Sequence, residues 1–467
     1  MDACCSSNAL LDMNKSSGKF KIKKSECAIL MLSIVFVSIF IPYLVGVNFV
    51  VQIASIFPLF IVGLVILPLL YRSPRVLIRR RLGNPKYILL ALVLPMPSLI
   101  VAVISGVWYA IGYTFLMIAV LTVCQLVLAL LPLSSILEAY TRAGVVIILG
   151  VLLLNPNGII SSATTASRFS PEYLHPNLLG FTFATFVVTF VWKTINHDAR
   201  YTTRIFYGVF AILALVIIFL ASSRASLLAV FCAVIGAWMI RFTRNLRGRR
   251  LFVRRSIPVL LPAAVAGLVF LVESTHILDH LAGYLTNLLQ IQSSYRGVGS
   301  GFSGRIPRWE ITISAISQNG LWALGEGYRT GDYNLGFSID NGYLTIIYEN
   351  GIFMLLFVVW QLFWLLLNCI KRYMSVHEQL LSNNLLALSG ILIVLFVNNF
   401  FDRYLLGLGN PASLLGLFLL LVERRDLLLL RKITSNAYYR AGEKIVFKDR
   451  VPKKHMSKVA GCHDPYI

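Results

Sequence analysis

Four charged residues lie in or next to strongly apolar sequence, and their types suit a phosphate-containing substrate. Arg224, in "SSRAS", is the only charged residue in the stretch 205–240. Arg305 and Arg308 follow in "SGRIPRW", and Asp340 begins "DNGYLTIIYENG". A guanidinium group stays charged and binds phosphate oxygens two at a time, whereas a carboxylate can accept a proton from a reacting hydroxyl. Together these residues could hold an anionic headgroup and remove a proton beside it.

The small residues around Arg224 fit this hypothesis. The stretch 205–240 is long enough for two membrane spans and too long for one, so we expect the chain to turn at "SSRAS". Arg224 would then lie near the membrane surface, where an arginine costs far less than the roughly 2.5 to 3.5 kcal/mol estimated for a helix centre. Ser223, one of three serines beside it, is a candidate substrate contact. The alternative is a snorkelling arginine or one paired with a carboxylate.

Asp340 and its neighbours have two interpretations. Asp340 could be a catalytic base, although an aspartate near its reference pKa of about 3.9 is a weak base unless desolvation raises that value. It also stands immediately before a predicted span, where Asp is a favoured helix N-cap, and both roles could hold together. Asn341 and Tyr343 are candidate substrate contacts. His175 of "HPNLLG" is another, although a turn that starts a helix explains the motif equally well.

Two further arginines could extend the cationic surface. They are Arg168 and Arg403, and each has an acid close by in the sequence, Glu172 and Asp402 respectively. A plain ion pair is the expected interpretation of both.

Composition indicates what must position these residues. The chain has 467 residues, 57% hydrophobic and 13% charged, with a mean hydropathy of +0.77. A bilayer solvates that much apolar sequence, whereas a water-soluble domain needs more polar surface. We predict an all-α integral membrane protein with about twelve transmembrane helices, each about 17 to 25 residues long. The apolar runs centre near Val37, Leu59, Leu94, Val120, Val146, Thr185, Leu213, Val230, Val265, Phe357, Leu392 and Leu415.

The net charge of +22 follows this topology. With the N-terminus inside, 35 of the 42 Lys and Arg residues fall in cytoplasmic segments, as expected for a multi-pass protein of a bacterial inner membrane. Both termini are then cytoplasmic, and the candidate residues face the periplasm. The basic balance reflects topology and anionic-lipid contact, so we expect no nucleic-acid partner.

The expected layout is one membrane domain with a single large outer insertion. Within the insertion we predict short helices at "HILDHLAGYLTNLLQIQ" and "RWEITISAISQN", a turn-forming stretch at "YRGVGSGFSGRIPRWE" and a loop at "GEGYRTGDYN". The predicted segments are a cytoplasmic tail at 1–24, helices 1 to 9 at 25–273, the periplasmic loop at 274–341, helices 10 to 12 at 342–423 and a basic cytoplasmic tail at 424–467.

The order of motifs resembles a known family. "HPNLLG", "SSRASLLA", "SGRIPRW", "LGEGY" and "DNGYLTIIYENG" occur in that order within residues 160–400. They are similar to successive signatures of the O-antigen ligase and O-antigen polymerase superfamily of bacterial membrane proteins. The first five spans carry no matching motif.

The resemblance implies a GT-C-like membrane glycosyltransferase that works on the periplasmic face. Its donor would be a glycan on undecaprenyl diphosphate, and its reaction would invert the anomeric carbon. Arg224 and Arg305 correspond to the family's diphosphate-binding arginines, and Arg308 is a third candidate, or else a partner of Glu310 or a cation over Trp309. We find no D-x-D pair, so we expect metal-independent catalysis without a cofactor.

One departure bears on the reaction type. The ligases usually have a histidine, the proposed base, where this chain has Asp340. In many polymerases of the superfamily this motif resembles that of the present chain. We therefore favour polymerisation of lipid-linked repeat units of O-antigen or another surface polysaccharide, with a protein that regulates chain length as a candidate partner. The alternative is a ligase that transfers the glycan to lipid A core or a protein. A polysaccharide flippase is more distant, because charges are nearly absent from the span interiors and no matching broken helices occur in two halves.

Overall fold

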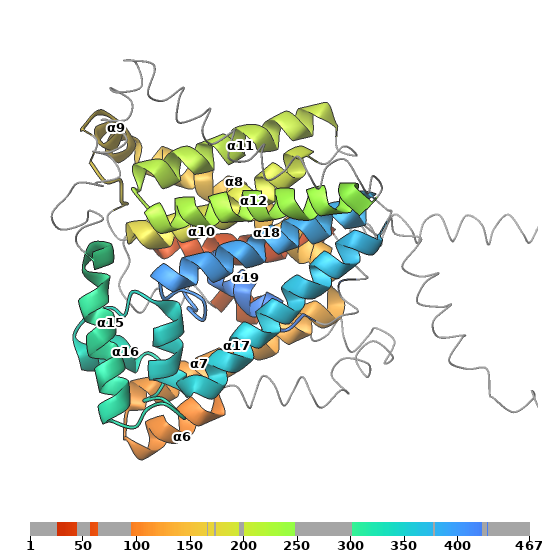
Figure 1. Ribbon diagram of the computed structural model, residues 1–467. Helices are drawn as coiled ribbons and strands as arrows, with labels where there is room; N and C mark the ends of the chain where they lie inside the picture. Colours follow the sequence, from red (N-terminus) through yellow and green to blue (C-terminus); the bar gives the residue numbers. More distant parts are fainter. Residues whose placement is uncertain are drawn as a thin grey trace, which may run out of the picture. The chain divides into compact units, whose positions relative to one another are not determined.

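The chain folds as a bundle of helices. A computed structural model describes residues 26–43, 57–63, 95–165, 167–171, 174–195, 200–247, 301–376, 379–422 and 427, and Ile29–Leu430 forms one compact unit. These described residues contain helices and no strand. Eight of the helices are long and apolar enough to cross a membrane, which makes the chain a multi-pass membrane protein. They are Glu26–Tyr43, α7 (Trp108–Leu130), α8 (Leu133–Leu154), α10 (Pro176–Ile195), α11 (Tyr201–Leu220), α12 (Arg224–Arg247), α17 (Gly342–Ser375) and α18 (Gln379–Phe401), most of which are labelled in Figure 1.

The eight helices coincide with eight of the predicted runs, and the total of twelve stays a prediction. The run near Val265 lies outside the described residues, as does the predicted helix "HILDHLAGYLTNLLQIQ". The run near Leu415 forms only a ten-residue helix, α19 (Pro411–Leu420). At 1.5 Å per residue such a helix is about 15 Å long, so α19 by itself is too short to cross the bilayer.

The shorter helices include two that the sequence did not predict. They are α6 (Met96–Ile104), α9 (Pro156–Thr165), α15 (Gly301–Gln318) and α16 (Thr330–Leu335). α9 was not predicted, and α16 lies within "GEGYRTGDYN", so the loop prediction was wrong for residues 330–334. α15 extends the predicted helix "RWEITISAISQN" backwards through residues that we expected to form turns, and it continues through Pro307. The turn prediction for residues 301–310 was therefore wrong.

α10 is the most buried of the long helices and lies at the centre of the bundle. It contacts α8, α11, α12 and α18, and Figure 1 shows α11, α12 and α18 side by side. The close approach of α10 and α12 depends on Gly180, because a Cβ there would lie 2.3 Å from the Ser223 hydroxyl. Small residues let membrane helices pack closely. The contact brings the start of α10 against the "SSRAS" turn.

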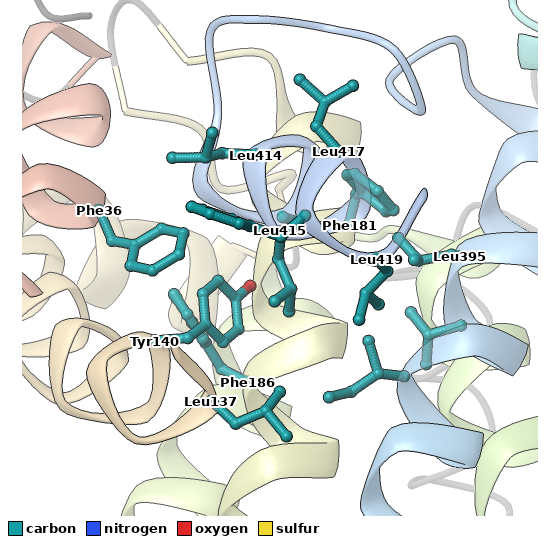
Figure 2. Close-up of a cluster of buried hydrophobic side chains, with 14 of the residues drawn as sticks. Phe36, Leu137, Tyr140, Phe181, Phe186, Leu395, Leu414, Leu415, Leu417 and Leu419 are labelled. Carbon is teal, nitrogen blue, oxygen red and sulfur yellow. The ribbon is translucent and has the colours of Figure 1, made fainter. Parts of the chain in front are cut away.

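Aromatic rings and leucines fill the core beneath that contact. Tyr140 lies between Phe36 and Phe186, with ring centroids 5.1 and 4.9 Å away. Figure 2 shows Leu415 of α19 beside Tyr140, and every residue of α19 is buried. Packed rings and leucines exclude water and fix the helices against one another.

The two ends of the bundle differ in chemistry. At one end, which we call the site end, α10, α12 and α17 begin and α18 ends, as shown by hydrogen bonds between their terminal residues. At the other end, Glu138 pairs with Lys193 and Arg142. Arg244 there donates to the Val376 carbonyl at 2.7 Å and lies over the Tyr373 ring. The candidate residues of the sequence analysis gather at the site end.

Candidate functional site

Arg224 is presented by a tight turn between two spans. α11 ends at Leu220 and α12 begins at Arg224, which confirms the turn predicted at "SSRAS". Ser222 adopts a left-handed backbone with φ of 51°, a conformation that few side-chain-bearing residues take. Ser223 and Ser226 are buried, and the Ser223 hydroxyl donates to Ser226 at 2.8 Å.

Those serine hydroxyls are used within the fold. Ser226 in turn donates to the Asn398 side-chain oxygen of α18 at 3.1 Å. Ser223, a candidate substrate contact, therefore belongs to a hydrogen-bond chain that fixes the turn. Its side chain thereby helps to fix the turn from which Arg224 begins α12.

Arg305 lies next to Arg224 although the two are far apart in the sequence. Arg305, on α15, is close enough for its positive charge to act directly on Arg224. Its guanidinium lies over the Phe401 ring at 5.9 Å, and only 14% of its side-chain surface is exposed. Two neighbouring guanidinium groups repel each other, and an anion between them relieves the repulsion.

Asp402 is the residue that sequence reasoning missed. Its Oδ1 accepts a hydrogen bond from Arg305 at 3.3 Å and another from the Asn177 side-chain nitrogen at 2.9 Å. Burial raises the pKa of Asp402 to about 6. The negative charge of Asp340 also raises this pKa, whereas the positive charge of Arg305 lowers it. An acid at the end of an apolar span, after "NNFF", was a signal that could have identified it.

The ion pairs expected for Arg403 and Arg168 differ from those in the structure. Arg403 pairs with Asp332 of α16 and not with Asp402, because the carboxylate of Asp402 is directed at Arg305. Arg168 donates to the Asn177 side-chain oxygen and, at 2.8 Å, to the Ala221 carbonyl. Glu172, its expected partner, lies outside the described residues.

Asp340 is not the N-cap of the helix that follows it. The cap of α17 is Asn341, whose side-chain oxygen accepts from the backbone N–H groups of Tyr343 and Leu344, both at 3.0 Å. Asp340 instead accepts from Arg308 at 2.8 Å and from the Ser338 hydroxyl at 3.1 Å. Its carboxylate is therefore bound by Arg308 and Ser338, and Asn341 caps the helix.

Arg308 is placed by the same contact. It pairs with Asp340 and lies over the Phe337 ring at 6.0 Å, rather than acting through Glu310 or Trp309 as we considered. The Arg308 side chain is 45% exposed, so the pair is solvated. Exposed pairs of this kind contribute about 0 to 1 kcal/mol to stability, and the contact can open readily.

His175 and Tyr343 have contacts within the fold. The Asn177 backbone N–H donates to His175 Nδ1 at 3.3 Å, which forms the turn that begins α10. The Tyr404 hydroxyl lies 3.4 Å from the same nitrogen. The Tyr343 hydroxyl donates to the Phe396 carbonyl at 2.8 Å and so joins α17 to α18. The Asn341 side chain caps α17. His175, Tyr343 and Asn341 therefore each form hydrogen bonds that stabilise the helices around the charged residues.

The "LGEGY" motif is held against α17 by backbone hydrogen bonds. The Glu326 and Gly327 N–H groups donate to the Tyr348 and Glu349 carbonyls at 2.8 and 3.0 Å, so the loop is fixed on α17. α17 bends at Gly351, which has φ of 82°, and a Cβ there would lie 2.0 Å from the Ala323 carbonyl oxygen. The motif thus packs on α17 at the bend of that helix.

The site as a whole combines guanidinium groups with two carboxylates. Arg305 lies near enough to Arg224 to act on its charge, it pairs with the buried Asp402, and Asp340, paired with Arg308, acts on the Asp402 carboxyl. Such an arrangement can bind a polyanionic headgroup and accept a proton near it. It lies at one end of the helical bundle.

The fold and the site together define a helical membrane protein with a cationic site at one end of its bundle. Residues 209–359 match the model of the O-antigen ligase family. The match confirms the resemblance to the O-antigen ligase and polymerase superfamily, and it contains Arg224, Arg305 and Asp340. No curated protein matches the chain.

Proposed function

We propose that this protein is a membrane glycosyltransferase that polymerises oligosaccharide repeat units carried on undecaprenyl diphosphate. The observation that carries the proposal is the pairing of Arg224 and Arg305 at the site end, with Asp340 nearby. A family match that includes all three residues supports it. The family's activity on lipid-linked glycans gives the substrate class.

The charges suit a diphosphate. Arg224 and Arg305 are contributed by two different helices, and their mutual repulsion favours a ligand with negative charge on adjacent groups. Asp402 contacts one terminal nitrogen of Arg305, which leaves the rest of that guanidinium for phosphate oxygens. Bidentate binding would stabilise the diphosphate as negative charge develops on it.

The transfer can be written with these residues. The acceptor hydroxyl attacks the anomeric carbon of the donor from the face opposite the diphosphate. The new bond from that carbon to the acceptor oxygen forms as the bond to the phosphate oxygen breaks, and the configuration inverts. The hydroxyl proton passes to the Asp340 carboxylate, and undecaprenyl diphosphate leaves against Arg224 and Arg305.

The Arg308–Asp340 pair couples these two roles. In the structure Arg308 occupies Oδ2 of the Asp340 carboxylate, the group that would accept the proton. A diphosphate beside Arg305 attracts Arg308 as well, and a solvated pair of this kind opens at little cost. Arrival of the donor would therefore free the base.

Transfer of a whole glycan to another acceptor is the second candidate. The matched family is described as O-antigen ligase, which favours transfer to lipid A core or a protein. The aspartate at 340, where the ligases usually carry histidine, favours polymerisation. The two reactions share the donor and the arginines and differ in the acceptor.

The bundle's polarity supports a location in the bacterial inner membrane with the site facing the periplasm. Lys193, Arg142 and Arg244 lie at the end opposite the site, where a cytoplasmic surface would carry basic residues. Both termini would then be cytoplasmic. Lipid-linked repeat units would reach the arginines from the outer leaflet.

The test uses the full chain, purified in a bilayer disc and supplied with undecaprenyl-diphosphate-linked repeat units extracted from cells that make them. A chelator is present throughout, because the proposed chemistry uses arginines in place of a metal. We expect a ladder of glycan lengths on a gel. Transfer of labelled glycan only to added lipid A core would replace the polymerase with the ligase, and absence of both products would overturn the proposal.

A further inference from the structure

We propose that Asn177, oriented by Arg168, is a positioning residue that fixes the Asp402 carboxylate and thereby directs Arg305 at the diphosphate. This inference rests on the proposed function, and it assigns a role to the "HPN" motif at the start of α10. Neither residue touches the reacting atoms in this account. They act through Asp402.

The first support is a continuous chain of hydrogen bonds. The Asn177 side-chain nitrogen donates to Asp402 Oδ1 at 2.9 Å, and Arg305 donates to the same oxygen at 3.3 Å. The Asn177 side-chain oxygen accepts from Arg168. Arg168 also donates to the Ala221 carbonyl at 2.8 Å. The chain therefore runs from the "SSRAS" turn through Arg168, Asn177 and Asp402 to Arg305.

The orientation of the Asn177 amide is determined by its partners. A guanidinium can only donate and an ionised carboxylate can only accept, so the amide oxygen must face Arg168 and the nitrogen must face Asp402. The alternative rotamer, with oxygen and nitrogen exchanged, would leave both partners facing a like group. Asn177 is the link that joins a positive and a negative group without a charge of its own.

Burial gives this link its strength. Asn177 is 8% exposed and Asp402 is 2% exposed. Hydrogen bonds to a charged group are stronger where water is excluded, and a buried carboxylate without them is strongly disfavoured. Asp402 Oδ2 is buried without a hydrogen-bond partner among the described residues, so its ionised form depends on what reaches Oδ1.

The "HPN" sequence places Asn177 at this point. Its backbone N–H donates to His175 Nδ1 at 3.3 Å, and Pro176 opens the helix between them. The turn therefore brings the side chain at the second position of α10 to the end of α18. A shift of one residue along the helix would turn it by about 100° and direct it elsewhere.

The groups that act on Asp402 give the proposal a distinctive signature. They are Arg305, Arg168, Asp340 and the Tyr404 hydroxyl, besides the hydrogen bond from Asn177. Asn177 and the two arginines favour the ionised carboxylate, whereas burial and Asp340 oppose it. Loss of the Asn177 bond should therefore raise the pH at which Asp402 gains a proton and releases Arg305.

The experiment measures binding of radiolabelled undecaprenyl diphosphate to the full chain in bilayer discs between pH 5 and pH 8. For the wild type we expect affinity to fall as the pH drops through about 6, the pKa of Asp402. Asn177→Leu keeps the side-chain size and removes the bond, and should move that midpoint upward by about one pH unit. Arg168→Gln should move it in the same direction by a smaller amount.

The matched control is Asn368→Leu. The Asn368 side-chain nitrogen donates at 2.8 Å to the Trp364 carbonyl on the same helix, without a charged partner. It should leave the midpoint unchanged. Equal weakening at every pH in Asn177→Leu, with the midpoint where the wild type has it, would show a merely structural role and overturn the inference.

Two further outcomes are decisive. If Asn177→Leu does not fold, Arg168→Gln alone decides: an upward shift supports the inference and an unmoved midpoint overturns it. If the wild type binds no undecaprenyl diphosphate at any pH, the proposed function has failed and the inference falls with it. Binding by the wild type with unshifted variants refutes the inference and leaves the function standing.

Discussion

Asp340 and Asn341 are adjacent in the chain, but their side chains have different partners in the structure. Asn341 accepts the two backbone N–H groups that open α17, while the Asp340 carboxylate faces Arg308. The sequence permitted both roles for Asp340, because Asp and Asn are about equally good N-caps. Because the cap and the carboxylate belong to different residues, substitutions at positions 340 and 341 can test the two roles separately.

We predict that substitution of Asp340 lowers turnover, whereas substitution of Asn341 lowers stability. Asp340→Asn removes the proton acceptor without touching the cap, so turnover should fall by at least about 100-fold while the thermal midpoint stays within a few degrees of the wild type. Asn341→Ala removes the cap and should cost about 1 kcal/mol of stability. Turnover and thermal unfolding, measured on both variants, check this. Normal turnover in Asp340→Asn would remove Asp340 from the chemistry.

The arginines show what residue-level reasoning could and could not predict. Arg224 was predictable, since a lone arginine in apolar sequence between small residues marks a turn at a membrane surface. The pairing of Asp402 was not predictable, because its partner Arg305 is on a distant helix and the adjacent Arg403 offered a simpler explanation. Arg403 reaches Asp332 instead. An ion pair between distant helices depends on which side chains face each other in the packed bundle. The separation of two residues in the sequence does not predict this.

At the scale of elements, close packing of α10 against α12 holds the "SSRAS" turn. Gly180 lies against the hydroxyls of Ser223 and Ser226, which a Cβ would approach to 2.3 and 2.7 Å. Both hydroxyls are buried and bonded, so they cannot swing away without losing those bonds. The two helices would have to separate.

Gly180→Ala should therefore impair the site by displacing Arg224. We expect a loss of about 1 to 3 kcal/mol of stability from overpacking, together with reduced turnover. Gly112→Ala is the matched control, because a Cβ at Gly112 of α7 would meet nothing within 4 Å, and alanine there should be neutral or slightly stabilising. Thermal unfolding and turnover of both variants decide. Equal behaviour of the two would show that this contact does not position the turn.

Long apolar runs predicted helices at eight positions where the structure has them, whereas local rules failed where tertiary contacts decide the structure. α15 begins within a Gly/Ser-rich stretch and continues through Pro307. Its packing on α17 stabilises a helix that local propensity disfavours. α19 reads as a span by composition, yet the helix is ten residues long and is buried on all sides.

At the scale of the molecule, the charge distribution makes a prediction about topology. Basic residues at the end opposite the site should face the cytoplasm. Asn319, at the site end beyond α15, and Ser375, at the far end of α17, are both exposed. In spheroplasts, a membrane-impermeant maleimide should label Asn319→Cys directly and Ser375→Cys only after lysis, above the background of the parent chain. The reverse pattern would place the site in the cytoplasm.

The central claim is that Arg224 and Arg305 together bind a lipid-linked diphosphate, and equilibrium binding of undecaprenyl diphosphate tests it most directly. Arg224→Lys and Arg305→Lys keep the charge and lose the planar fork, so each should weaken binding about 10- to 100-fold at pH 7.5 while the protein still folds. Arg142→Lys, at the opposite end, keeps its pairing with Glu138 and should bind as the wild type does. Wild-type affinity in both site variants would contradict the account.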